Sequence, residues 1–262
     1  MNFETKVALV TGAGQSIAGS HLSGIGQAVA LNLAKAGAYI FVNDWNADAA
    51  ERTVKMIISQ GGQAESVVAD VSDENQIIAT VDRIQAQHVR IDILVHCAAV
   101  QYPVSLFDLQ ADQWRRVLDH NLFGTFCVAR AVAKVMKTQN ADEDRSRGKI
   151  VLLTSIHDAR PRVGKFDYDA AKAGVSQLTR ELALALAPDH INVNAIAPGA
   201  ICTPMNIILE QDGVDKEAIK KIPWGRMGQS DEVAKLAMFL LSDDADYITG
   251  SVIPIDGGRS LV

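Results

Sequence analysis

Three side chains in one short stretch of the sequence could move a proton to or from a substrate oxygen. Tyr168 is followed four residues later by Lys172 and is preceded, thirteen residues upstream, by Ser155. Residues four apart on a helix lie one turn apart on the same face, so the Lys172 ammonium can lie beside the Tyr168 phenol. A neighbouring cation favours the phenolate, and we therefore expect Lys172 to lower the pKa of Tyr168 from its ordinary value of about 10. The three groups would then form an acid/base device around one reacting carbon.

A regular alternation of strands and helices must position this device. Short runs rich in β-branched residues are predicted as buried strands at 6–11, 39–43, 65–69, 91–97, 149–154, 191–197 and 251–255. Amphipathic stretches are predicted as helices at 23–36, 47–60, 74–87, 111–137, 168–187 and 231–240. Near-continuous apolar strands, each followed by a helix, indicate a parallel sheet covered on both faces. We predict an α/β fold, a single doubly wound (Rossmann) domain over residues 1–262 with a seven-stranded parallel sheet.

The first predicted strand runs into a glycine-rich stretch that could bind a dinucleotide. Gly12 and Gly14 follow the strand, and Ser23-Gly24-Ile25-Gly26 opens the first predicted helix. Glycines let the backbone approach a pyrophosphate, whose charge is stabilised at a helix N-terminus. Asp44, at the end of the second strand, can accept hydrogen bonds from ribose hydroxyls and would repel a 2′-phosphate, although it could also cap the helix that follows. No Arg or Lys lies within 12–26 or directly after Asp44, so NAD is favoured over NADP.

Composition narrows the class of partner. The 262 residues are 48% hydrophobic with a formal net charge of −6 and no basic stripe, which argues against nucleic acid and anionic membranes and favours a small-molecule substrate. No apolar run reaches the roughly 18 residues of a membrane span, and the first residues do not resemble a signal peptide, so we expect a cytoplasmic protein. Cys97, Cys127 and Cys202 are far apart, which favours reduced thiols and offers no metal site.

Together these motifs resemble the short-chain dehydrogenase/reductase family, and the resemblance spans essentially the whole chain. Its glycine pattern Thr-Gly-x-x-x-Gly-x-Gly is matched by Thr11, Gly12, Gly24 and Gly26. Further matches are the Asp-Val step beside adenine (Asp70-Val71), the catalytic Asn, Ser, Tyr and Lys (Asn121, Ser155, Tyr168, Lys172), the nicotinamide-contacting turn (Pro198-Gly199 with Thr203) and the C-terminal Asp256-Gly257-Gly258.

The resemblance implies a role for each matched residue. Tyr168 would be the general base in alcohol oxidation and the general acid in carbonyl reduction, while Lys172 would also hold the nicotinamide ribose. Ser155 would orient the substrate oxygen, and Asn121 would hold a water that links Lys172 to solvent. The cofactor would contact Gly12, Gly14, Ser23, Gly24, Ile25, Gly26, Asp44, Asp70, Val71, Cys97, Ala98, Ala99, Tyr168, Lys172, Pro198, Gly199, Ile201 and Thr203. Relatives are commonly tetramers, so a homo-oligomer is expected.

Two stretches depart from the family pattern. Residues 15–22 are inserted where relatives have a tight turn, so residues 15–18 could instead mimic the glycine turn, although 23–26 fits better. After the fourth predicted strand, His96-Cys97-Ala98-Ala99 stands where relatives usually carry Asn-Asn-Ala-Gly. We expect His96 to replace a lost hydrogen bond, and Cys97 to be a small core residue.

The loop after Ser155 bears on the substrate. Ser155-Ile156-His157-Asp158 resembles the Ser-x-His-Glu of sugar and polyol dehydrogenases in the family, and a His beside an acid can bind several hydroxyls. We expect Ser155, His157 and Tyr168 to contact a sugar or polyol, and residues 204–223 to form a substrate lid. Arg160, Arg162 and Lys165 could recognise the carboxylate or phosphate of a variant such as a sugar acid, or could be solvated or subunit-contact charges.

Two other functions remain open. A 3-oxoacyl-[acyl-carrier-protein] reductase is the main enzymatic alternative, but its usual NADPH dependence fits Asp44 poorly. A catalytically idle, NAD-binding regulatory protein is the alternative from another class.

Overall fold

The computed structural model describes residues 2–15, 17, 22–140, 146–209 and 219–262. A seven-stranded sheet, in which each neighbouring pair is parallel, runs in the order β3-β2-β1-β4-β5-β6-β9. The strands are β1 (Val7–Thr11), β2 (Tyr39–Asp44), β3 (Gln63–Val68), β4 (Ile93–His96), β5 (Gly148–Leu153), β6 (Ile191–Pro198) and β9 (Val252–Ile255). The predicted parallel sheet is confirmed, and each strand begins and ends within two residues of its predicted bounds.

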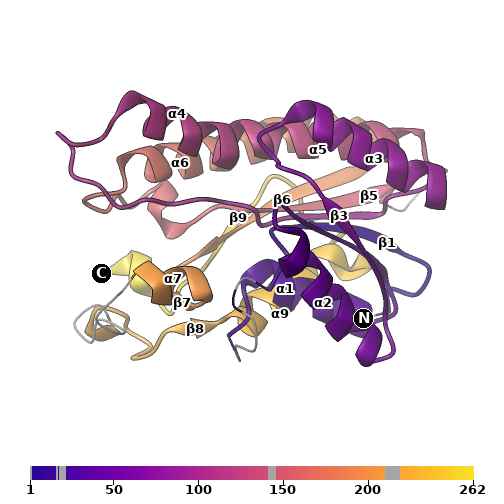
Figure 1. The fold of residues 1–262 in the computed structure, drawn as a ribbon, viewed down its shortest axis with the longest axis horizontal. Helices are drawn as coiled ribbons and strands as arrows, with labels where there is room; N and C mark the ends of the chain where they lie inside the picture. Colours follow the sequence, from indigo (N-terminus) through magenta and orange to yellow (C-terminus); the bar gives the residue numbers. More distant parts are fainter. Residues whose placement is uncertain (1, 16, 18–21, 141–145, 210–218) are drawn as a thin grey trace.

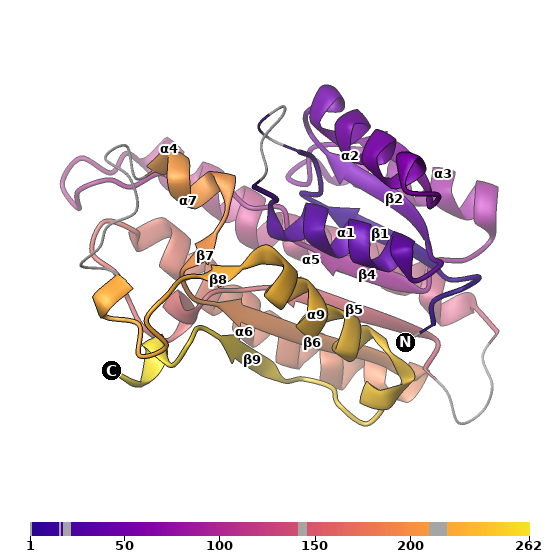
Figure 2. The same cartoon turned by 90° about the horizontal axis from the view of Figure 1, so that it is seen from below.

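Helices cover both faces of the sheet, so the doubly wound architecture is also confirmed (Figure 1 and Figure 2). One face carries α1 (Ile25–Lys35), α2 (Ala47–Ser59) and α9 (Ser230–Leu241); the other carries α3 (Glu74–His88), α4 (Ala111–Leu118), α5 (Gly124–Thr138) and α6 (Phe166–Leu186). Successive residues of a strand point to opposite faces. In β1, Ala8 and Val10 join one hydrophobic core, and Val7 and Leu9 join the other.

The strand order reverses beside β1, and this reversal creates the place for a site. The chain passes from β1 outward to β2 and β3, then returns to place β4 on the opposite side of β1. The loops that leave β1 and β4 therefore diverge to opposite faces, which opens a crevice at the carboxyl ends of the strands.

Residues 111–137, predicted as one helix, are two helices joined by a π-helical turn. α4 ends at Leu118, the turn comprises Asp119–Phe123, and α5 begins at Gly124. The prediction of an uninterrupted helix is wrong here because a single π turn shifts the register without interrupting the helical sequence pattern. Asn121 lies in this turn, where such bulges often mark functional positions.

The segment after β6 was not predicted in detail. A short parallel pair, β7 (Ile201–Cys202) with β8 (Gly228–Gln229), and a short helix, α7 (Pro204–Leu209), lie below the sheet in Figure 1. Residues 210–218 of the expected lid lie outside the described residues, as do residues 16 and 18–21 of the insertion in the glycine stretch. Within the described part of the chain, no helix is both long and apolar enough to span a membrane.

Gly26 tests how closely α1 packs on the turn after β1. A Cβ at Gly26 would lie 2.4 Å from the main-chain oxygen of Gly12, whereas one at Gly24 would meet nothing within 4 Å. Because main-chain atoms must shift to accept it, we expect Gly26→Ala to lower the free energy of unfolding by about 1–3 kcal/mol. Urea denaturation measures the change, with Gly24→Ala as the matched control. Equal losses in the two variants would contradict this close contact.

Candidate active site

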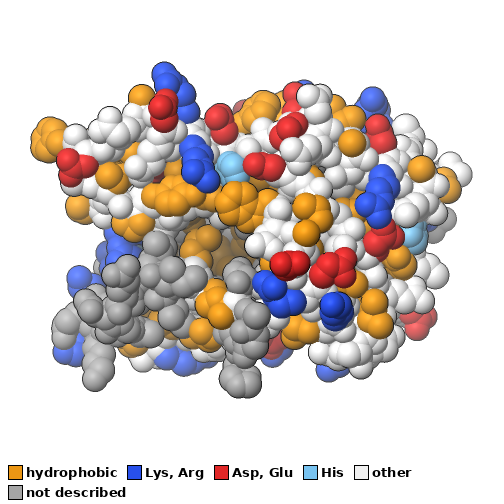
Figure 3. Space-filling view, viewed as in Figure 1, with side chains coloured by type: hydrophobic (Ala, Val, Ile, Leu, Met, Phe, Trp, Pro, Cys, Tyr) orange, Lys and Arg blue, Asp and Glu red, His pale blue; other side chains and the backbone are white. Residues whose placement is uncertain are grey.

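Two cavities meet at the carboxyl ends of the strands. Cavity A, of about 260 Å³, extends from the turn after β1 past the end of β2. Cavity B, of about 340 Å³, lies over the ends of β5 and β6 and reaches α7 and the C-terminal turn. Both are lined by Ile25, Tyr168, Thr203 and Met205, so they form one continuous site with Tyr168 at the junction. Figure 3 shows that this face of the molecule is hollowed, with hydrophobic side chains around the opening.

Glycines and an uncapped helix form one wall of cavity A. Gly24 is the N-cap of α1 and supplies no side-chain hydrogen bond, so main-chain N–H groups at this helix start lack a side-chain cap. Gly12 has a φ of 60°, and a Cβ there would lie 2.7 Å from the main chain of Ala98. The expected glycine turn is therefore built from 12–14 and 24–26, and these residues line the cavity, while the Ser23 carbonyl accepts a hydrogen bond from Ser230 (2.6 Å).

Asp44 lies at the end of β2 and faces the glycine turn. Its carboxylate accepts hydrogen bonds from the main-chain N–H groups of Gly14 and Asn46, both at 3.0 Å. Burial raises the pKa of Asp44, while these hydrogen bonds and the charge of Arg52 act in the opposite direction. Asp44 is not the cap of the next helix, because Asn46 caps α2. Sequence reasoning missed Arg52, which lies on α2 and donates to the Gln15 carbonyl (2.7 and 3.1 Å).

An aromatic group borders cavity A beyond Asp44. The Trp45 side chain is 60% exposed, and its ring meets the His120 ring edge-on at a centroid distance of 6.2 Å. His120 Nε2 lies 3.3 Å from an oxygen of Asp70. Asp70 and Val71 line the cavity as expected. Trp45 and His120 were not predicted, because residues 75 positions apart in the chain meet only through the fold.

Ser155, Tyr168 and Lys172 come together where the cavities join. Ser155 follows β5 and accepts a hydrogen bond from the His157 N–H (3.2 Å), while Tyr168 lies in the first turn of α6. The Lys172 ammonium is buried, lies 5.6 Å from the centroid of the Tyr168 ring and donates to the Leu153 carbonyl at 2.7 Å. The spacing of the three residues in the sequence therefore predicts their proximity correctly.

The expected pKa of Tyr168 is wrong for this structure. Burial raises it to about 12, and the hydrogen bond with Ser155 offsets only part of that rise. Burial also lowers the pKa of Lys172 to about 8. Its ammonium is directed at the Leu153 carbonyl, so desolvation outweighs the expected electrostatic effect of Lys172 on the phenol.

Asn121 lines neither cavity but positions the chain beside them. Its side-chain oxygen accepts from the Val100 N–H and its amide donates to the Val100 carbonyl, both at 2.8 Å. The Asn121 carbonyl accepts from the Thr125 hydroxyl (2.7 Å). The π turn, in which Asn121 is the buried residue, is thus tied to the loop after β4, and Val100 is part of the wall of cavity A.

His96 makes the replacement hydrogen bond that was expected of it. Its Nδ1 lies 2.9 Å from the Thr11 hydroxyl, which also accepts from the N–H groups of Cys97 and Ala98 (3.2 and 3.3 Å). Burial lowers the pKa of His96 to about 3 and raises that of Cys97 to about 12. His96 is therefore a neutral group that joins the ends of β1 and β4, and Cys97 is a thiol rather than a thiolate.

Of the neighbouring residues His157 and Asp158, only His157 lines cavity B. His157 lines cavity B, and its Nδ1 lies 2.8 Å from the Arg160 carbonyl. Burial lowers its pKa, which favours the neutral imidazole. Asp158 instead turns inward and accepts hydrogen bonds from Ser176 and Thr154. Asp158 therefore does not line cavity B, because the 3-10 turn at Ile156–Asp158 points its side chain toward α6.

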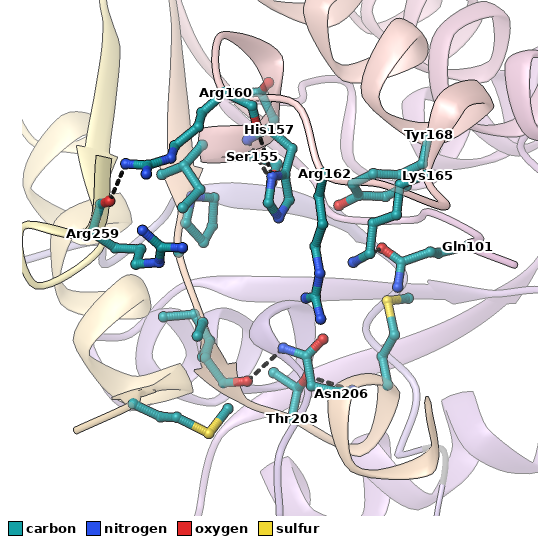
Figure 4. Close-up of a pocket in the computed structure, with 18 of the residues that line it drawn as sticks. Gln101, Ser155, His157, Arg160, Arg162, Lys165, Tyr168, Thr203, Asn206 and Arg259 are labelled. Atoms are coloured by element: carbon teal, nitrogen blue, oxygen red, sulfur yellow. Dashed lines mark hydrogen bonds between the residues drawn. The ribbon is translucent and has the colours of Figure 1, made fainter. Parts of the chain in front are cut away.

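Most of the remaining expected contact residues border the site. Ala99, Cys97 and Ala98 line cavity A; Pro198, Gly199 and Ile201 line cavity B. Cavity B also has a polar wall that motifs did not reveal, formed by Gln101, Asn206 and Arg259, which Figure 4 labels, and by Lys221. Their convergence follows from the sheet order and is invisible in local sequence.

The chain is similar to several known proteins over nearly its whole length. Residues 19–260 match the family described as Enoyl-(Acyl carrier protein) reductase. The chain is 36% identical over 258 residues to a 3-oxoacyl-[acyl-carrier-protein] reductase of Thermotoga maritima, covering 98% of this chain and 99% of the relative. It is 34% identical over 259 residues to glucose 1-dehydrogenase 2 of Bacillus subtilis, covering 98% and 95%. The crystal structure of a gluconate 5-dehydrogenase from Burkholderia cenocepacia in complex with NADP and tartrate superposes with a TM-score of 0.89 at 33% identity, covering 100% and 97%.

The low pKa of Lys172 gives a pH-dependent test of the site. Burial lowers it from 10.5 to about 8, so the unfolded chain holds this proton more tightly than the folded protein between those pH values. We expect the wild type to gain stability over Lys172→Met as pH rises, by about 2 kcal/mol between about pH 7.5 and about pH 9.5. Urea denaturation at about pH 7.5 and about pH 9.5 measures it. Lys134→Met, at an exposed position on α5, is the control, and a pH-independent difference for Lys172→Met would contradict the burial.

Proposed function

Because the chain belongs to the short-chain dehydrogenase/reductase family, we propose that it interconverts a secondary alcohol and a carbonyl on a sugar, polyol or sugar acid, with NAD. It is an NAD(P)-dependent oxidoreductase of that family. The observation that carries the proposal is the meeting of Ser155, Tyr168 and Lys172 at the junction of the two cavities. One cavity can take the cofactor and the other the substrate, with the proton-transfer group between them.

The walls of cavity A fit a dinucleotide. The uncapped start of α1 and the glycine turn suit a pyrophosphate, since main-chain N–H groups bind phosphate oxygens well. Asp44 suits the hydroxyls of an adenosine ribose, and its charge disfavours the 2′-phosphate of NADP. The exposed Trp45 ring and Val71 suit an adenine. A bound nicotinamide dinucleotide would supply the hydride acceptor in oxidation and the hydride in reduction.

Tyr168 is the proposed proton-transfer group. In oxidation it takes the proton from the substrate hydroxyl, and in reduction it returns a proton to the carbonyl oxygen. Ser155, at the other side of the phenol, orients that oxygen and shares the charge that develops on it. A neutral phenol with a raised pKa is the form ready for carbonyl reduction. Oxidation needs the phenolate, which the neighbouring Lys172 ammonium would have to stabilise against the effect of burial.

Lys172 and Asn121 support this step in the proposal. The Lys172 ammonium, held by the Leu153 carbonyl, stays within reach of the phenol and of a ribose hydroxyl. Asn121, in the π turn, has a main-chain carbonyl that can hold a water linking Lys172 to solvent. In this proposal Lys172 acts on the Tyr168 phenol and on the ribose, and Asn121 acts through the water that it holds beside Lys172.

The polar wall of cavity B supports a hydroxyl-rich substrate. His157, Gln101 and Asn206, which Figure 4 shows around cavity B, offer directional donors and acceptors to a substrate. The names of two similar proteins, a glucose 1-dehydrogenase and a gluconate 5-dehydrogenase, point the same way. A 3-oxoacyl-[acyl-carrier-protein] reductase remains the second candidate, favoured by the 36% identity to such an enzyme.

Two further expectations remain proposals. We infer a homo-oligomer, a tetramer by the family resemblance. The described ends of the expected lid border cavity B through Met205, Asn206, Lys221 and Ile222, which supports a role for this segment in enclosing substrate.

A substrate panel tests the function. With NAD, we expect absorbance at about 340 nm to rise with sugars, polyols or sugar acids, and Tyr168→Phe to lose at least about 100-fold of that rate because its phenol carries the proton. The variant should still bind NADH, measured by fluorescence titration, since only one hydroxyl is removed. Activity confined to acyl thioesters with NADPH would select the second candidate, and a catalytically idle regulatory protein would bind NAD without any turnover. Normal turnover in Tyr168→Phe would refute the assignment of Tyr168.

Asp44 tests the cofactor preference. We expect Asp44→Asn to raise the ratio of kcat/KM with NADP to that with NAD by about 10- to 100-fold, because it removes the charge that repels a 2′-phosphate while Arg52 stays nearby. Asp48→Asn, which removes an exposed charge from the first turn of α2, is the control. An unchanged ratio in Asp44→Asn would mean that another group sets the preference.

A further inference from the structure

Cavity B has an unusual distribution of charge for a site that would bind a neutral sugar. Its lining includes five cations and no Asp or Glu among the described residues: Arg160, Arg162, Lys165, Lys221 and Arg259. The whole chain carries a net charge of −6, so this concentration of positive charge is opposite to the average of the molecule. A low-dielectric cleft focuses such a field on its contents.

Arg162 is a cation of cavity B whose side-chain N–H groups are available to a ligand. Its main-chain N–H binds Asp169 (2.8 Å), but no described residue accepts a hydrogen bond from its guanidinium or forms an ion pair with it. In Figure 4 its side chain extends across the cavity, from the loop that carries His157 toward Thr203 and Asn206. A guanidinium in this position can offer two parallel N–H groups to a planar carboxylate.

Lys165 lies beside Arg162, next to the reacting centre. Its ammonium donates to the Gln101 side chain at 2.7 Å and lies 5.5 Å from the centroid of the Tyr168 ring. Gln101 therefore fixes this charge at the mouth of the site. Figure 4 shows Arg162 and Lys165 on the same side of the cavity, near Tyr168.

The other cations of the cavity already have partners or lie at its edge. Arg160 donates to the Arg259 carbonyl (2.7 Å), and Arg259 donates to the Val262 carbonyl (3.2 Å), so this pair ties the C-terminal turn to the loop. Lys221 is exposed at the rim. Outside the lining, the carboxylate of Asp169 interacts electrostatically with both Arg162 and Lys165. Two cations facing one carboxylate leave one net positive charge, which matches a singly charged group better than a dianionic phosphate.

We propose that cavity B selects sugar acids over neutral sugars and polyols, with the substrate carboxylate bound between Arg162 and Lys165 and the reacting hydroxyl at Tyr168. This proposal rests on the proposed function and names the class of its substrate. In oxidation the C–H bond of the hydroxyl-bearing carbon would break and pass its hydride to the oxidised dinucleotide, while the O–H bond would break and pass its proton to the phenolate form of Tyr168. A C=O bond forms at that carbon, and the carboxylate of the substrate takes no part in the reaction. The product is a keto acid.

Matched substrate pairs test the selection. Each aldonate of four to six carbons is compared with the alditol of the same stereochemistry, which replaces the carboxylate by a neutral CH₂OH. We expect kcat/KM with NAD to be about 10- to 100-fold higher for the acid of the best pair, the range of one or two charge-assisted hydrogen bonds. Added salt should narrow this gap, since it screens charges at an exposed arginine.

Variants of Arg162 test whether this residue causes the preference for aldonates over alditols. We expect Arg162→Gln to raise KM for the aldonate by about 10- to 100-fold with little change in kcat, and to leave KM for the alditol unchanged. Arg162→Lys should restore part of the affinity, because it returns the charge without the planar fork. Arg180→Gln, which removes an exposed charge from the far part of α6, is the matched control and should behave as wild type.

The outcomes separate this proposal from the function on which it rests. Equal use of aldonates and alditols, or equal effects of Arg162→Gln on both, overturns the carboxylate site and leaves the oxidoreductase intact. A preference for sugar phosphates over aldonates also overturns it. If no pair is oxidised, the proposed function fails. The carboxylate site can then still be tested by the melting temperature measured with aldonate and NAD present. The proposal requires that the aldonate raises the melting temperature of the wild type and does not raise that of Arg162→Gln.

Discussion

The site depends above all on the hydrogen bond between the buried Lys172 ammonium and the Leu153 carbonyl. An ammonium removed from water costs several kcal/mol unless polar groups compensate, so Lys172 is tolerated only where the end of β5 offers it an oxygen at 2.7 Å. A second bond, from the Thr154 hydroxyl to the Lys172 carbonyl (2.9 Å), joins the same two elements. Together they fix the rotation and the height of α6 on the sheet. Tyr168, one turn before Lys172, and Ser155, two residues after β5, are thereby brought to one point.

The sheet order supplies the space around that point. Because β4 lies on the opposite side of β1 from β2, the loops after β1 and β4 separate and leave a crevice between them. The ends of these two strands must nevertheless stay together, and the contact between His96 and Thr11 joins them. The Asn121 side chain, in the π turn, then holds the loop after β4 at Val100.

Cavities A and B differ in the charge of the residues that line them. Cavity A has a carboxylate, Asp44, near the glycine turn, and in the proposed function this charge disfavours the 2′-phosphate of NADP by repulsion. Cavity B has cations on its walls, which suit the anionic substrate that we propose. Tyr168 and Lys172 lie between these fields, in a buried position where small changes of neighbouring charge have large effects on protonation. Binding in either cavity therefore alters the electrostatics of the same phenol.

The sequence by itself determined the doubly wound fold and the proximity of Ser155, Tyr168 and Lys172. Buried parallel strands are apolar throughout, and helical spacing places Tyr168 above Lys172; both are local patterns.

The tertiary structure decided what depends on distant segments or on burial. The π turn at Asn121 and the meeting of Trp45 with His120 leave no local signal. The inward rotation of Asp158 and the raised pKa of Tyr168 follow from α6 packing on the sheet. Arg162 and Lys165 were visible in the sequence only as two charges in a loop. Their position across the cavity from Thr203 and Asn206 comes from the sheet order, because only the fold brings the ends of β5 and β6 to one edge.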